Sequence, residues 1–168
     1  ARHGSGYLKA ALAKSAPADA TAPKKAVEIP KNNLIQNPGF EAISGEMPKI
    51  WKPRNYSGKA THKIVSPGRG GKGYAIMIES DSGADSSVFI DVKVKKRTTY
   101  ELTAWIKTEG VKTLRGGRGA QLNLHALPDQ PRTAAVKGDK DWTRVSVRFK
   151  TDDRGTVGIN CLYGGWGH

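Results

Sequence analysis

The chain has 168 residues, of which 37% are apolar, and it contains 20 Gly, 9 Pro and a single cysteine, Cys161. This length leaves room for one ordinary domain and a tail, and the Gly and Pro content favours a loop-rich, all-β domain over a helical bundle. One cysteine excludes an internal disulfide and a cysteine-based metal cluster, and no apolar run approaches the roughly 18 residues of a membrane-spanning helix.

The formal net charge of +13 favours anionic partners such as an acidic or sulfated polysaccharide, a membrane surface or nucleic acid. A solvated basic surface that keeps the protein soluble is the open alternative. The tightest basic cluster is KVKKR, residues 93–97, at a point where a strand should turn. Because it is not interleaved with aromatic residues, nucleic acid ranks last among these partners.

The first 32 residues predict a short helix followed by a linker. Residues 5–15, SGYLKAALAKS, put apolar side chains on one side of an amphipathic helix that Ser5 could cap, and this helix could be the end of a preceding domain. Residues 16–32 are rich in Ala, Pro and charge without periodicity, which predicts a semi-extended linker. The N-terminus shows no signal peptide, and we expect the chain to be a fragment of a longer protein.

The composition changes at Asn33, and residues 33–168 alternate between apolar and polar side chains. Strict alternation indicates antiparallel strands with one face on a core, and repeated short strands separated by turns predict an antiparallel β-sandwich, or jelly roll. In the first segment, NLIQNPGFE, Leu34 and Phe40 are expected to enter the core, and Trp51 and Trp142 are expected to plug strand ends. The alternating segments are residues 87–94, 99–108, 120–127, 143–149 and 156–163.

No catalytic pattern emerges from these segments. The glycine-rich stretches, residues 68–73 and 115–119, lie between strands and lack the strand–turn–helix context of a phosphate-binding loop. The four histidines lack the helical spacing of a zinc enzyme. Asp91 and Glu101 are carboxylates in predicted strands, but nothing in the sequence places them across one cleft as the catalytic acid pair of a glycosidase. We therefore expect a protein that is not an enzyme.

Five motifs occur in an order and spacing that resemble the carbohydrate-binding modules attached to xylanases and glucanases, within the galactose-binding-like jelly-roll superfamily. The resemblance covers residue 33 to the C-terminus. The motifs are NLIQNPGFE (33–41), PKIW (48–51), GYAIMI (73–78), YELTAWIK (100–107) and WTRVSVRFKT (142–151). The resemblance implies a binding module located outside the cell: secreted, periplasmic or at the cell surface.

The resemblance also implies one structural calcium, held in such modules by the glutamate of the first strand and an aspartate of a last strand. Glu41 matches the glutamate, whereas the chain ends near YGGWG, where that last strand should begin, so the domain could lack it. A salt bridge is therefore the open alternative for Glu41, whose carboxylate needs a partner beside a buried Phe40.

Modules of this kind expose one sheet face to the ligand, and the side chains that alternate away from the core are the candidates here. Amides and imidazole offer donors and acceptors to sugar hydroxyls, and an indole offers a plate for stacking. The alternative is that a loop covers Trp105 and the amides brace neighbouring strands. The face would carry Thr103, Trp105, Gln121, Asn123, His125 and Asn160, and a loop rim could bring Arg118, Tyr163 and Trp166 towards Tyr56.

The sequence thus predicts a non-catalytic module that binds a polysaccharide, with acidic glycans favoured by the positive charge, and that is linked to other domains of a parent protein. The alternative is a structural or protein-interaction module that docks on a partner through an open sheet edge.

Overall fold

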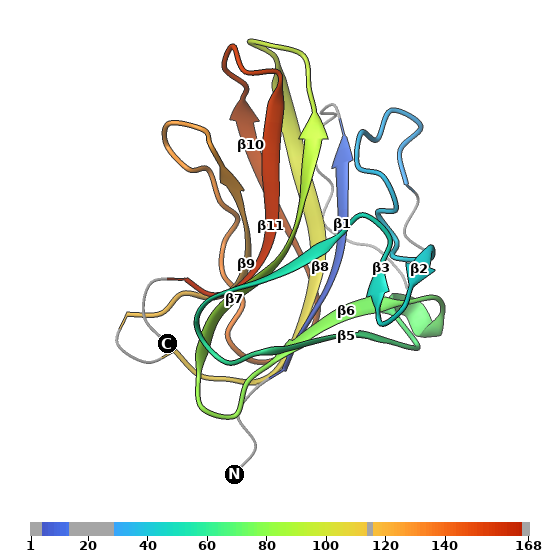
Figure 1. The fold of residues 1–168 in the computed structure, drawn as a ribbon, viewed down its shortest axis with the longest axis vertical. Helices are drawn as coiled ribbons and strands as arrows, with labels where there is room; N and C mark the ends of the chain where they lie inside the picture. Colours follow the sequence, from blue (N-terminus) through green and yellow to red (C-terminus); the bar gives the residue numbers. More distant parts are fainter. Residues whose placement is uncertain (1–4, 14–28, 114–115, 166–168) are drawn as a thin grey trace.

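A computed structural model of the chain describes residues 5–13, 29–113 and 116–165, with residues 5–13 described by their backbone alone. The described residues form an all-β structure without an α-helix, which confirms the predicted antiparallel sandwich (Figure 1). The elements are β1 (Ser5–Ala13), β2 (Ile43–Ser44), β3 (Met47–Pro48), β4 (Lys52–Gly58), β5 (Thr61–Val65), η1 (Arg69–Gly71), β6 (Ala75–Glu79), β7 (Ala84–Lys93), β8 (Thr99–Val111), β9 (Gly119–His125), β10 (Gly138–Lys150) and β11 (Thr156–Gly164). None of the described residues belongs to a helix that could cross a membrane.

Two sheets enclose one core. The five-stranded sheet has the order β10-β8-β1-β6-β5, the four-stranded sheet has the order β4-β7-β11-β9, and β2 and β3 form a separate pair. Buried side chains of both sheets belong to a single hydrophobic cluster. A polar contact also joins the sheets, because the His62 Nε2 of β5 lies 2.7 Å from the Ser86 Oγ of β7.

The alternation seen in the sequence decides which side chains enter this core. Because successive side chains of a strand point to opposite faces, every second residue is buried between the sheets. The prediction is confirmed for four strands, whose core-facing residues are Val88, Ile90 and Val92 in β7, Tyr100, Leu102, Ala104 and Ile106 in β8, Ala120, Leu122 and Leu124 in β9, and Val157, Ile159 and Cys161 in β11.

The opening segment enters the core through a different set of residues than predicted. Phe40 is buried as expected, and its ring packs edge-on against that of Trp51, with centroids 5.2 Å apart. The Trp51 indole N–H donates to the carbonyl of Asn37 over 3.2 Å. The prediction for Leu34 is wrong, since this residue is 38% exposed and its neighbour Ile35, at 4%, takes the core position.

Trp142, the other expected core plug, is only half-buried in β10 and is not among the core residues.

The prediction of a helix near the N-terminus is wrong over residues 5–13, which form β1. This strand pairs antiparallel with β8 along its whole length, from Ser5–Glu109 to Ala13–Glu101, and with β6 on its other side. Figure 1 shows β1 running beside β8. A helix of this length is marginal by itself in water, whereas two flanking strands offer hydrogen bonds to both edges of an extended segment.

β1 therefore lies inside the five-stranded sheet. Residues 14 and 15 of the predicted helix and residues 16–28 of the predicted linker lie outside the described residues, and the division of the chain at residue 33 stays a prediction.

Candidate functional site

The described residues form a pocket of about 380 Å³ on the four-stranded sheet, over the face that points away from the core. Its lining combines residues of all four strands of this sheet with residues of three connecting or terminal segments, one before β9, one after β9 and one after β11. The lining residues are Tyr56, Ser57, Asp85, Arg118, Gln121, Asn123, His125, Gln130, Arg132, Leu162 and Gly165.

Strand β9 supplies the centre of the pocket. Its apolar residues face the core, so the residues between them, Gln121, Asn123 and His125, point to the other face and line the pocket. In the antiparallel register with β11, Asn123 lies directly opposite Asn160, which is 1% exposed. Two amide side chains are thus held side by side below the pocket surface.

An aromatic contact crosses the pocket from the opposite edge of the sheet. The Tyr56 ring of β4 lies 6.2 Å from the His125 ring of β9, although β7 and β11 separate these two strands. A β-bulge between Asn55 and Ser57 places Tyr56 out of the regular register. The Arg54 guanidinium lies 5.7 Å from the Tyr56 ring and 3.9 Å from the Phe89 ring. Together these side chains extend over the middle strands.

The segment after β9 folds back along this edge strand and builds one wall. Asn123 and Arg132 form an isolated bridge, and the Leu124 N–H donates to the Pro131 carbonyl over 2.9 Å. The Arg132 Nε donates to the Gln130 carbonyl over 3.3 Å. This backbone pairing brings the side chains of Gln130 and Arg132 to the pocket.

The end of β11 builds the opposite wall. The Gly165 N–H donates to the Asp85 carboxylate over 3.1 Å, and the Arg118 N–H donates to the Gly164 carbonyl over 2.8 Å. A Cβ at Gly165 would lie 3.2 Å from the Gln121 Nε2, and Gly165 has a φ of +70°. Glycine therefore allows the main chain to approach the amide of Gln121 closely.

Several buried polar atoms of this face have no hydrogen-bond partner among the described residues. They are the Ser87 Oγ, the Asn123 Oδ1 and the Asn160 Nδ2. A buried polar atom without a partner costs about 1–3 kcal/mol. These atoms lie on one face of three adjacent strands, β7, β11 and β9. A ligand or water that enters there would recover part of this cost.

The histidine of the pocket is held in its neutral form. Burial lowers the pKa of His125 below its ordinary value, and the charge of Arg54 lowers this pKa further. A neutral imidazole carries one donor and one acceptor. The ring can therefore exchange hydrogen bonds with a hydroxyl in either direction.

The structure brings together six of the ten predicted ligand-binding residues. Gln121, Asn123 and His125 of the predicted sheet face share the pocket with Tyr56 and Arg118 of the predicted rim, and Asn160 lies beside Asn123. Those interpretations agree with the geometry, while the binding role of each residue stays a prediction.

Other predicted residues lie elsewhere. Thr103 and Trp105 are in β8, which belongs to the five-stranded sheet, so they cannot share a face with β9. The Arg69 guanidinium lies 3.5 Å from the centroid of the Trp105 ring, so a loop side chain covers the indole. Tyr163 is buried towards the core, and Trp166 lies outside the described residues. Strand parity places Thr103 and Trp105 on the face of β8 that points away from the core, but it does not say which sheet a strand joins.

Sequence reasoning missed Asp85, Gln130, Arg132 and Leu162, all of which line the pocket. Leu162 and Asp85 alternate away from the core and could have been found by parity. Gln130 and Arg132 follow a strand without regular alternation, and only the backbone bridge to Asn123 brings them to the site.

Glu41, the predicted calcium ligand, is exposed, and its carboxylate lies against Gly73 so closely that a Cβ there would clash. Within residues 29–113 and 116–165, no group of three or more His, Cys, Asp or Glu side chains could hold a metal ion. Calcium binding stays a prediction.

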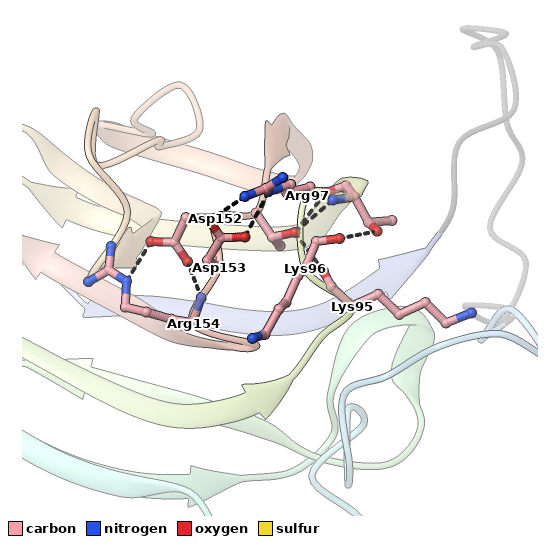
Figure 2. A network of polar contacts seen from close by, with 8 residues as sticks. Lys95, Lys96, Arg97, Asp152, Asp153 and Arg154 are labelled. Carbon is pink, nitrogen blue, oxygen red and sulfur yellow. Dashed lines mark hydrogen bonds and ion pairs between the residues drawn. The ribbon is translucent and has the colours of Figure 1, made fainter.

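The predicted basic hairpin end does lie in a turn, between β7 and β8, and acidic residues face it. The Arg97 guanidinium donates twice to the Asp153 carboxylate of the connection between β10 and β11, over 2.8 and 2.9 Å, and Arg154 pairs with Asp152 within that connection (Figure 2). Asp153 balances the charge of Arg97 and Asp152 that of Arg154, while Lys93, Lys95 and Lys96 keep the surface formed by the two turns positively charged.

The comparison with known families agrees with this geometry. The CBM_4_9 family, described as a carbohydrate binding domain, matches residues 32–160. The chain belongs to this family of carbohydrate-binding domains. No curated protein sequence matches the chain.

Proposed function

We propose that the protein is a non-catalytic module that binds a polysaccharide in the pocket on the four-stranded sheet. The observation that carries this proposal is the convergence of Gln121, Asn123, His125 and Tyr56 on one pocket in a chain of a carbohydrate-binding family. Its volume of about 380 Å³ falls in the range of roughly 300–1,000 Å³ that is typical of small-molecule sites.

The chemistry of the lining suits a sugar. Sugar hydroxyls both donate and accept hydrogen bonds, and so do primary amides and a neutral imidazole. The partnerless Asn123 Oδ1 is an acceptor that a hydroxyl would satisfy. The half-exposed Tyr56 ring offers an apolar plate to the C–H groups of a pyranose.

The same lining argues against hydrolysis of the bound sugar. Glycosidases use two carboxyl groups on either side of the scissile bond. Asp85 is the single carboxylate among the described lining residues, and its Oδ1 already accepts the Gly165 N–H. We therefore propose binding without catalysis, as an accessory module of a larger protein that acts on polysaccharides outside the cell.

The proposal is tested by a glycan array followed by titration calorimetry with the glycan that binds best. Gln121→Ala and Asn123→Ala should each weaken binding by roughly threefold to tenfold, the effect of one lost hydrogen bond. Ser146→Ala removes an exposed hydroxyl in the other sheet and should leave binding unchanged. Full binding by both amide variants contradicts the proposed site, and new reducing ends in the bound polysaccharide contradict the absence of catalysis.

The alternative of a protein-interaction module gains no support from the described strands. Such a module would dock on its partner through an open sheet edge. The longer edge strand of the five-stranded sheet is β10. This strand carries exposed Lys and Arg residues and two register shifts, which are features that protect an edge from pairing.

A further inference from the structure

We infer that the sugar bound in this pocket is acidic and that Arg118 and Arg132 recognise its negative charge. The inference rests on the proposed function and names the class of its ligand. It depends on two separate features of the pocket: positive charges without an ion pair, and a buried acceptor without a hydrogen-bond partner, both among the described residues.

The charges of the pocket are unbalanced. Arg118 and Arg132 line it, and Arg54 lies beside its Tyr56 wall. Asp85 is the acidic residue among the described lining residues, and the lowered pKa keeps His125 uncharged at neutral pH. The net charge of the described lining is therefore positive.

The two arginines differ from three other arginines of the described surface. Arg97, Arg144 and Arg154 each lie within 4 Å of an acidic partner. No ion pair within the described part of the chain includes Arg118 or Arg132. Arg132 uses its Nε for the carbonyl of Gln130, which leaves its terminal amino groups available. Both guanidinium groups can thus offer charged donors to a ligand.

The buried acceptor narrows the class of ligand. A carboxylate or sulfate group would pair with guanidinium groups, frequently through two parallel hydrogen bonds. A simple anion has no donor for the Asn123 Oδ1, which is partnerless in a side chain that is 8% exposed. A ligand with both anionic acceptors and hydroxyl donors satisfies both groups. An acidic sugar, either a uronic acid or a sulfated sugar, has this chemistry.

The test compares two pairs of probes that share a sugar backbone and differ in its charged group. Polygalacturonate and its fully methyl-esterified form separate the carboxylate from the rest of the sugar, and dextran sulfate and dextran do the same for the sulfate ester. We expect the protein to bind at least one charged probe about tenfold or more tightly than its neutral counterpart, since a charge-assisted hydrogen bond contributes about 1.5–3 kcal/mol. The charged probe that binds more tightly shows whether the pocket prefers a carboxylate or a sulfate group.

The variants Arg118→Gln and Arg132→Gln should each weaken binding of the preferred charged probe by about tenfold and leave binding of its neutral counterpart unchanged. Arg144→Gln is the matched control, because it removes the same charge from the other sheet and breaks only a pair of the exposed Arg144 with the half-buried Glu101, whose atoms are 3.9 Å apart. We expect this control to change binding less than about twofold.

Three results would overturn the inference. Equal binding of charged and neutral probes means that the pocket does not recognise the negative charge of the ligand. A loss with Arg144→Gln as large as that with Arg118→Gln and Arg132→Gln means that the net charge of the protein, rather than the pocket, attracts the ligand. Unchanged binding of the charged probe by Arg118→Gln and Arg132→Gln means that these two arginines do not recognise the ligand. If a neutral glycan binds at least as tightly as the charged probes and Asn123→Ala weakens its binding, the inference fails while the proposed function stands. If no glycan binds, both this inference and the proposed function fail.

Discussion

Replacing Tyr56 with alanine tests whether the aromatic wall of the pocket contacts the ligand. Tyr56 is 42% exposed and lies 6.2 Å from the His125 ring across the pocket. We expect Tyr56→Ala to weaken polysaccharide binding by about 10- to 400-fold without unfolding the protein. Surface substitutions usually change stability by less than about 0.5 kcal/mol.

The magnitude follows from the area that a sugar could cover. An aromatic side chain buries about 150–250 Å² in full, so the exposed 42% of Tyr56 corresponds to about 80 Å². Covering half to all of this area contributes about 1–2 kcal/mol at about 25 cal/mol per Å². Stacking adds about 0.5–1.5 kcal/mol. The sum of about 1.5–3.5 kcal/mol corresponds to a roughly 10- to 400-fold change in Kd.

Titration calorimetry measures this change, and thermal unfolding of the same samples reports their stability. Trp105→Ala is the informative comparison, because Trp105 is the aromatic residue that the sequence favoured and the structure places it in the other sheet under Arg69. We expect Trp105→Ala to retain binding. Lost binding in Trp105→Ala together with full binding in Tyr56→Ala would refute the reasoning and move the site to the five-stranded sheet.

Three further predictions concern the fold and its pH dependence. Ile35→Ala should lower the free energy of unfolding by about 2–5 kcal/mol in urea titrations, whereas Leu34→Ala should change it by less than about 0.5 kcal/mol; equal effects would contradict the core assignment. Leu8→Pro should destabilise the protein by about 1–3 kcal/mol in thermal unfolding, because it removes a backbone donor from a strand with partners on both sides; a stability equal to that of the parent chain would mean that β1 is not part of the sheet. Because the folded pKa of His125 is lowered, the unfolded state binds more protons below pH about 6.5, so stability should fall as the pH falls through this region. His125→Gln should reduce the fall between pH values of about 7.5 and 5.5, and a fall parallel to that of the parent chain would show that another group, such as His62, causes it.

Much of the candidate site follows from alternation in single strands. In β9 the order of Ala120, Gln121, Leu122 and Asn123 shows that the amides face away from the core, and the structure confirms that orientation. This succeeds because the side-chain period of a strand is independent of what the strand pairs with.

The errors have a different origin. Trp105 has the same parity in β8 as Asn123 has in β9, yet these strands belong to different sheets. Residues 5–13 have helical spacing of apolar side chains, but pairing with β8 and β6 overrides this weak local preference. Gln130 and Arg132 reach the pocket through backbone pairing of a segment without its own periodicity.

The sequence by itself determined the class of fold, the residues that alternate into the core and the polar character of the face opposite, because these depend on local periodicity. The tertiary structure alone decided which polar faces meet, since sheet order depends on pairing between segments far apart in the chain. That pairing sets Tyr56 of β4 across from His125 of β9 and Arg132 beside Asn123. It also gives the N-terminal segment its place as a strand between β8 and β6.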